Sequence, residues 1–233
     1  MLKLNKAVAS TLGQKFLMAI TGLALVLFVI FHLFGNLTIL AHDPNVFNVF
    51  SDKLVSLGTI LNILELTLLA LALIHISLAL RLKWLAFRAR PIGYAEKHSK
   101  GRPSKYGLAS ARMVPTGFMI LVFLVIHLTQ FKFGPGIAEG YKTIVNGEMI
   151  RDLHRVEFEA FSSISTVIFY VACMLFLGFH LRHGVWSSFQ SLGGTNSRTS
   201  QPIYRLGGYL AIFLVMGFLI IPIWVYLKAT GVL

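Results

Sequence analysis

The sequence has little cysteine and little charge. Cys173 is the only cysteine among 233 residues, which excludes a framework of internal disulfides and any metal site built from several thiolates. Only 13% of the residues are charged, against about 25% in typical soluble domains. Because 56% of the residues are hydrophobic and the mean hydropathy is +0.74, the composition indicates a membrane protein.

Acidic residues are the scarcest charged type. The chain has 9 Asp and Glu against 21 Lys and Arg, a net charge of +12. A basic chain can bind nucleic acid, but here fifteen of the basic residues lie on one side of the predicted membrane spans and six on the other. The positive-inside rule then predicts a cytoplasmic N-terminus and a C-terminus outside, so the charge is first a signal of topology.

Long apolar runs are what the sequence does contain. Five are long enough to cross a hydrocarbon core of about 30 Å, at residues 16–40, 59–84, 114–131, 161–181 and 204–227. The first run lacks a small-residue cleavage site and continues into a polar turn at His42, so it is not a cleaved signal peptide. We predict an all-α membrane protein, a single domain over residues 1–233, with five transmembrane helices in a bundle.

The first and third spans repeat one pattern. "TGLALVLFVIFHL" (21–33) and "TGFMILVFLVIHL" (116–128) share a Thr-Gly pair and a histidine ten residues after the glycine. The apolar matches carry little weight, because membrane spans are built from few residue types and such matches are common by chance. The second and fourth spans each place a histidine near the C-terminal end, so we expect a two-helix unit used twice, with a fifth helix added.

Four histidines lie inside the predicted spans, and position along a helix converts to depth at about 1.5 Å per residue. Spans one and three run outward, so His32 and His127 lie near the outer side. Spans two and four run inward, so His75 and His180 lie near the cytoplasmic side. An interhelical hydrogen bond explains one such residue, but ionisable groups within a bilayer mark functional sites. Four intramembrane histidines that match in depth two by two therefore favour two pairs of ligands.

Two imidazoles without further ligands favour haem over other metal centres. Zinc takes four protein ligands, or three and a water, and copper often takes Cys or Met. A haem iron needs only two axial imidazoles, since the porphyrin fills its other positions. We therefore predict two bis-histidine b haems, with all six iron positions filled, for electron transfer rather than oxygen chemistry. Four glycines are small enough to let a porphyrin ring approach: Gly22, Gly35, Gly117 and Gly178.

Several stretches resemble a known family. They are "STLGQKFLMAITG" (10–22), "PIGYAEKHSKGRPSKYGLASARMVPTG" (91–117) and "LGFHLRHGVWSSFQSLG" (177–193), together with the four placed histidines. Over nearly the whole chain, these residues resemble the five-helix, two-haem cytochrome b subunit of succinate dehydrogenases and fumarate reductases. The resemblance implies that His75 and His180 ligate the proximal haem, nearer the cytoplasm, and that His32 and His127 ligate the distal haem.

The resemblance also implies partners. A FAD-bearing subunit and an iron–sulphur subunit would dock on the cytoplasmic face of a bacterial inner membrane, as part of respiratory complex II and the tricarboxylic acid cycle. Succinate and fumarate would react there and not on this chain, while a quinone, usually menaquinone, reacts in the membrane. A higher oligomer of the whole complex is open. Some related fumarate reductases carry a proton-transferring glutamate two residues before the fourth ligand, where this chain has Gly178. That departure favours succinate oxidation.

Glu65 is the only carboxylate inside a predicted span. It lies ten residues before His75, about 15 Å further out, near the expected level of the distal haem. Two interpretations stand: a neutral, hydrogen-bonded glutamate, or a group that exchanges protons with quinone on the outer side. A quinone site on the inner side, near the basic loop, also stays open.

Three residues near the cytoplasmic ends of spans two and four are candidates to bind haem propionates: Arg81, Arg182 and Trp186. Anchors at the lipid headgroups have the same composition, so this signal is weak. His183 shares the helix end with His180 but lies nearer the headgroups. His42 lies just outside the first span, and His154 is expected to be solvated.

Two other functions remain open. The cytochrome b anchor of a hydrogenase, formate dehydrogenase or nitrate reductase also holds haem between helix histidines, although its flanking sequences are less similar. A small transporter with a histidine proton relay belongs to another class and predicts a protein without haem.

Overall fold

The computed structural model describes residues 6, 9–89 and 113–233. In this part of the chain, five helical segments are long and apolar enough to cross a membrane. They are α2 (Thr11–Asn36) with its 3-10 extension η1 (Leu37–Leu40), α4 (Thr59–Ala89), α6 (Met113–His127) with its π-helical extension η2 (Leu128–Lys132), α8 (Ile164–Ser191) and α9 (Ser200–Ala229). The five predicted spans are confirmed as helices, although the fourth begins at Ile164 and not at residue 161, which ends a preceding short helix. Each is longer than its apolar run, because backbone hydrogen bonding continues into the polar flanks.

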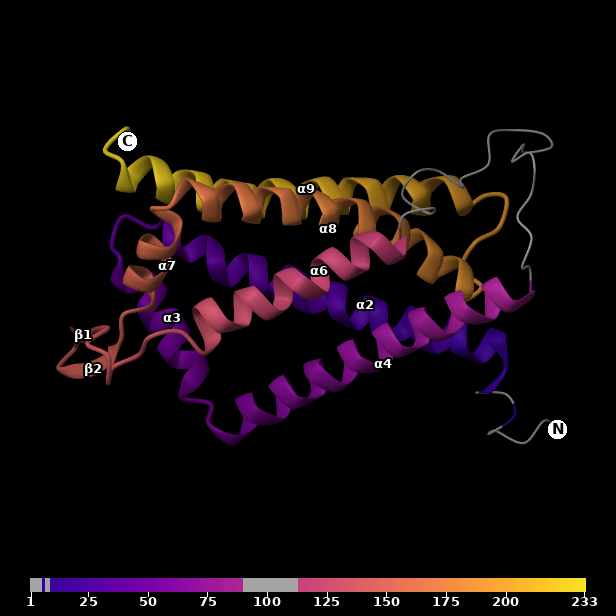
Figure 1. The fold of residues 1–233 in the computed structure, drawn as a ribbon, viewed down its shortest axis with the longest axis horizontal. Coiled ribbons are helices and arrows are strands. Elements are labelled where there is room, and N and C mark those ends of the chain that lie inside the picture. Colours follow the sequence, from indigo (N-terminus) through magenta and orange to yellow (C-terminus); the bar gives the residue numbers. More distant parts are fainter. Residues whose placement is uncertain (1–5, 7–8, 90–112) are drawn as a thin grey trace.

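The long helices run along the longest axis of the molecule in alternating directions (Figure 1). The start of α2 and the end of α9 therefore lie at opposite ends, as an odd number of spans requires. Five such helices indicate a multi-pass membrane protein. The basic stretch at 90–112, which carries much of the topology signal and part of the family resemblance, lies outside the described residues.

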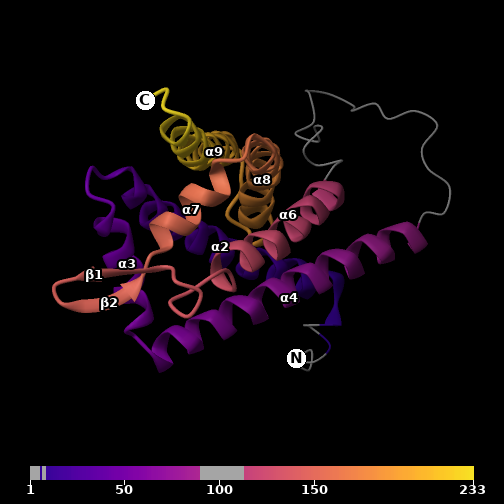
Figure 2. The same ribbon diagram turned by 60° about the vertical axis from the view of Figure 1, so that its left-hand side comes forward.

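Short elements gather at the end of the molecule where α9 finishes (Figures 1 and 2). They are α3 (Asn45–Val55), β1 (Lys142–Val145), β2 (Glu148–Arg151) and α7 (Leu153–Phe161). The strands form an antiparallel hairpin whose two turn residues, Asn146 and Gly147, have φ of 52° and 85°. Tight hairpin turns with positive φ at both positions match the twist of the strands. The all-α expectation is thus corrected by one small hairpin outside the apolar runs.

The core is centred on α8 and α9, which lie side by side (Figure 2). Leu214 and Val225 of α9 are fully buried. A Cβ atom on Gly178 would stand 2.6 Å from Val215 Cγ2, and one on Gly217 would stand 2.6 Å from Leu33 Cδ2. Small residues let transmembrane helices approach closely, so Gly178 has a packing role against α9.

Helix α4 is packed differently. None of its residues is buried, and its main contacts are with α2. Figure 2 shows it along the edge of the molecule. Apolar side chains such as Leu66 (66% exposed) and Leu73 (56% exposed) face outward, which suits contact with lipid.

Candidate functional site

The four histidines of the long helices meet in two pairs. The ring centroids of His75 on α4 and His180 on α8 are 6.4 Å apart, and those of His32 on α2 and His127 on α6 are 5.7 Å apart. We call the first pair proximal and the second distal. All four side chains are half-buried. The pairing expected from depth alone is the pairing that the structure shows.

Both separations suit two histidines that would bind one metal ion between them. With metal–nitrogen bonds of about 2.0 Å, two imidazoles on opposite sides of a metal ion have ring centroids about 6 Å apart. Within the described ranges, no three His, Cys, Asp or Glu side chains form a group that could hold a metal ion. Each pair has two imidazoles, the number of protein ligands that a bis-histidine haem would require. Its role as a haem site stays a prediction.

The two pairs lie at different levels along α2. Thr21 contacts the proximal His75, and His32 of the distal pair follows eleven residues later on the same helix. At about 1.5 Å per residue, the levels differ by about 16 Å, roughly half the thickness of a hydrocarbon core. The arrangement places one pair in each half of the membrane-spanning region.

The proximal pair is flanked by hydroxyl groups and by glycine. Thr21 Oγ1 lies 3.3 Å from His75 Nδ1, and Thr116 Oγ1 lies 3.3 Å from His180 Nδ1. The residue after each threonine is a glycine whose missing Cβ leaves room for the ring. The repeated Thr-Gly dipeptide was visible in the sequence. Only the fold shows that each Thr-Gly dipeptide lies beside a histidine of another span.

The four glycines expected near a porphyrin divide into two kinds. A Cβ on Gly22 would stand 3.1 Å from His75 Cε1, and one on Gly117 would stand 3.4 Å from His180 Cε1. Gly35 instead faces the Phe50 ring, as Gly178 faces α9. For Gly35 and Gly178 the expectation is corrected, since close packing within the protein requires them.

Aromatic rings surround the distal pair. Those within 6.2 Å of the His32 or His127 ring, between centroids, are Phe28, Phe123, Phe131, Tyr170 and Phe218. The Nδ1 atom of His127 is buried without a hydrogen-bond partner in the described part of the chain. The helix changes from α to π geometry directly after His127, a distortion that often accompanies functional sites.

Glu65 lies near the start of α4, where it forms an ion pair with Lys132 of η2. Its side chain is 37% exposed. The contact with Lys132 is the hydrogen bond that the structure shows for Glu65, and the choice between the two interpretations stays a prediction. Lys132 follows His127 by five residues, so Glu65 contacts a residue within about two turns of the distal pair.

Arg182 and Trp186 meet around Tyr204 of α9. An Arg182 Nη2 donates to the Tyr204 hydroxyl at 3.1 Å, and the Trp186 ring lies 5.9 Å from the Tyr204 ring. Arg81 is exposed on α4, and His183 is half-buried one turn beyond His180. The structure thus brings two of the three propionate candidates together, two to six residues after a proximal histidine. Their role stays a prediction.

Glu157 is a buried carboxyl group that the sequence did not mark. It lies on α7, is only 5% exposed, and its Oε2 has no hydrogen-bond partner among the described residues. Burial raises the pKa of Glu157 to about 8. The adjacent Glu159 is exposed and accepts hydrogen bonds from Tyr141 and Arg155, which hold its pKa below the usual value. The two glutamates differ in burial and in pKa because they lie on different faces of α7.

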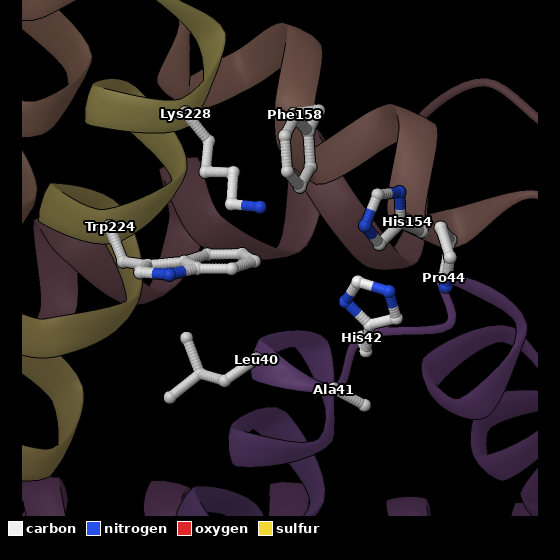
Figure 3. Close-up of a pocket in the computed structure, with 8 residues that line it drawn as sticks. All are labelled: Leu40, Ala41, His42, Pro44, His154, Phe158, Trp224 and Lys228. Atoms are coloured by element: carbon white, nitrogen blue, oxygen red, sulfur yellow. The ribbon is translucent and has the colours of Figure 1, made fainter. Parts of the chain in front are cut away.

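A pocket of about 380 Å³ opens where α7, η1 and the end of α9 meet (Figure 3). Its lining consists of Leu40, Ala41, His42, Pro44, His154, Phe158, Trp224 and Lys228. Lys228 Nζ lies 5.3 Å from the Trp224 ring, and His154 stacks on Phe158 with centroids 4.3 Å apart. His154 is half-buried, not fully solvated as expected, and burial lowers its pKa. Neither histidine pair lines this pocket.

Comparisons of the chain with protein-family models, with curated proteins and with solved structures found no match. The features of the site are thus two histidine pairs among apolar helices and one exposed ion pair, between Glu65 and Lys132.

Proposed function

We propose that this chain is the membrane-anchoring cytochrome b subunit of a succinate:quinone oxidoreductase in a bacterial inner membrane. In this role it transfers electrons between an iron–sulphur subunit and menaquinone or another quinone. The observation that supports the proposal best is the pair of histidine pairs, from four helices, with ring separations of 6.4 and 5.7 Å. The family resemblance of the flanking residues supports the choice among cytochromes.

Each pair would hold one b haem between two helices. His75 and His180 would bind the proximal haem, and His32 and His127 the distal one. A haem bound in this way supplies one-electron chemistry, because neither face of the iron is open to oxygen. The chain's own task is to hold the imidazoles at the right distance, and to keep water from them with apolar helices.

The proposed topology determines which face meets the partner subunits. The distribution of basic residues supports a cytoplasmic start of α2, which puts the proximal pair in the cytoplasmic half. A flavoprotein subunit and an iron–sulphur subunit would then dock on that face. Succinate is oxidised on those partners, so this chain acts as a subunit of an enzyme and carries no dicarboxylate site.

Glu65 is the proposed proton-exchanging residue for quinone. Reduction of a quinone consumes protons as well as electrons, and Glu65 is a carboxylate near the level of the distal pair. Its partner Lys132 holds the side chain at the end of η2. An exposed carboxylate can pass protons between a bound quinone and the aqueous phase on the outer side.

The test is the visible spectrum and subunit content of the full-length chain purified from its native membrane. The proposal expects a b-type spectrum and co-purified subunits that carry flavin and iron–sulphur clusters. A hydrogenase-type anchor would show haem with other partners. A folded but colourless protein would overturn the proposal, and would favour a histidine-relay transporter.

A further inference from the structure

One five-residue pattern occurs twice, at the same place in the repeated unit. It is Met-x-x-Thr-Gly, at residues 18–22 of α2 and at residues 113–117 of α6. In both copies a distal histidine follows the threonine by eleven residues. The threonine itself lies beside a proximal histidine on a different helix, so α2 and α6 contribute to both pairs.

The hydrogen-bond geometry is the same in the two copies. The hydroxyl of Thr21 donates to backbone carbonyls one turn earlier, at Leu17 (2.9 Å) and Met18 (3.1 Å). The hydroxyl of Thr116 donates to the Met113 carbonyl at 3.1 Å. Each threonine oxygen also lies 3.3 Å from the Nδ1 atom of its histidine.

The backbone contacts of the threonines favour one tautomer of both histidines. A hydroxyl has one proton, and when a backbone carbonyl accepts it, the oxygen is left to accept a hydrogen bond from the ring. In that arrangement the Nδ1 atoms of His75 and His180 carry the proton. A neutral imidazole has one N–H, which leaves Nε2 bare and able to bind a metal.

The distal pair has no equivalent arrangement in the described residues. The Nδ1 atom of His127 is buried without a partner, among aromatic rings. A metal-bound imidazole that donates its other N–H to an oxygen is a more basic ligand. More basic ligands stabilise the higher oxidation state of the metal. The two sites thus differ in a property that tunes the redox potential.

We propose that Thr21 and Thr116 are positioning residues that hold His75 and His180 in the Nδ1–H tautomer and lower the redox potential of the proximal haem alone. The inference rests on the proposed function, because it requires haem at the proximal pair. Gly22 and Gly117 are part of the same arrangement, because the absence of a side chain at these positions lets the His75 and His180 rings reach the threonines.

The test measures the midpoint potentials of both haems in the full-length complex carrying Thr21→Val, Thr116→Val or both. Valine keeps the shape of threonine and removes the acceptor. Loss of an outer-shell partner typically costs a metal site 10- to 100-fold in affinity. We expect each change to reduce the preference for ferric over ferrous iron by about tenfold, a rise of about 59 mV for one electron. The double variant should shift further, with the distal potential unchanged.

Two controls separate the hydroxyl from packing. Thr67→Val on α4 removes a hydroxyl that also donates to a carbonyl one turn earlier, at Ile63 (2.8 Å). Among the described residues this hydroxyl makes no hydrogen bond with a histidine, so the change should shift neither potential. Thr21→Ser and Thr116→Ser keep the acceptor and should retain the wild-type potential. If the valine variants lose the proximal haem, its retention in the serine variants supports the proposal, and its loss there overturns it.

Two failures are distinguishable. A wild-type complex without haem would overturn the proposed function. A complex with two haems whose potentials are unchanged in the valine variants, or shift equally at both sites, would overturn only the role of the threonines. Electron paramagnetic resonance of the ferric haems gives an independent readout, in which only the proximal signal should change.

Discussion

The proximal and distal histidine pairs have similar ring separations but different surroundings. At the proximal pair, a threonine oxygen lies 3.3 Å from each Nδ1 atom. At the distal pair, aromatic rings enclose the imidazoles, and His127 Nδ1 is buried without a partner in the described chain. The two pairs thus combine similar ring separations with surroundings of different polarity.

The difference has a simple origin in the repeat. Helices α2 and α6 each carry a threonine and, eleven residues later, a histidine. Because an α-helix rises about 1.5 Å per residue, the two side chains act at levels about 16 Å apart. Each of these helices thus supplies a hydrogen-bond acceptor to the proximal level and a ligand to the distal level. Variants can address the two levels separately.

The largest expected effect is loss of one haem. His180→Ala removes a proximal ligand and should leave one b haem per chain, measured as haem per protein. His183 lies one turn further on the same helix, is half-buried, and is assigned to no pair. His183→Ala should retain both haems. Loss of a haem in His183→Ala, or retention of both haems in His180→Ala, would contradict the assignment of the proximal pair.

A bulky residue beside the proximal pair should weaken haem binding almost as strongly as the loss of a ligand. A Cβ on Gly22 would stand 3.1 Å from His75 Cε1, so Gly22→Val must displace the ring. We expect the proximal haem to be lost or bound more weakly in a haem titration, with the distal haem kept. Gly208→Val on α9 is the matched control, because nothing lies within 4 Å of its missing Cβ. Equal effects of the two variants would contradict the account.

Glu65→Gln tests the distal side without touching a ligand. The variant removes the proton-exchanging carboxylate and its ion pair with Lys132. Succinate:quinone turnover should fall by at least about tenfold, the lower range for a lost acid–base group. Both haem spectra should be unchanged. Loss of the distal haem would instead make the role of Glu65 structural.

The smallest effect concerns stability at the end of the molecule where α9 finishes. Burial raises the pKa of Glu157 from 4.5 to about 8, so the folded chain keeps a proton that the unfolded chain releases. Stability from this group is complete below about pH 4.5 and falls as the pH rises to about 8. Glu157→Gln should remove that decline, on the order of a few kcal/mol.

The measurement is the thermal unfolding midpoint in detergent at pH 5 and pH 8. The difference between the two pH values should be larger for the wild type than for Glu157→Gln. Glu159→Gln on the exposed face of α7 is the control. If Glu157→Gln leaves the pH dependence unchanged, the side chain is not buried as described.

Much of the fold and the pairing of the histidines could be predicted from the sequence. Apolar length determines the spans, and depth follows from position in a helix of constant rise. The contacts of Thr21 and Thr116 could not be predicted, because they depend on how each helix is rotated toward its neighbour. The same limit applies to the choice between Gly22, which faces a ligand, and Gly178, which faces α9.

Polar segments were predicted least well. The hairpin, α3 and α7 lie outside the apolar runs, where composition alone predicts only loops. The burial of Glu157 depends on α7 packing between neighbouring helices, and the ion pair of Glu65 with Lys132 joins residues far apart in the chain. Tertiary contacts decide both, and periodicity carries no information about them.

The most direct test of the central claim is the haem content of two double variants. His75→Ala/His180→Ala removes both ligands of one pair, and His75→Ala/His127→Ala removes one ligand from each pair. The account predicts one b haem per chain in the first variant and none in the second. Equal haem content in the two variants, at any level, would contradict the assignment of four histidines to two separate sites.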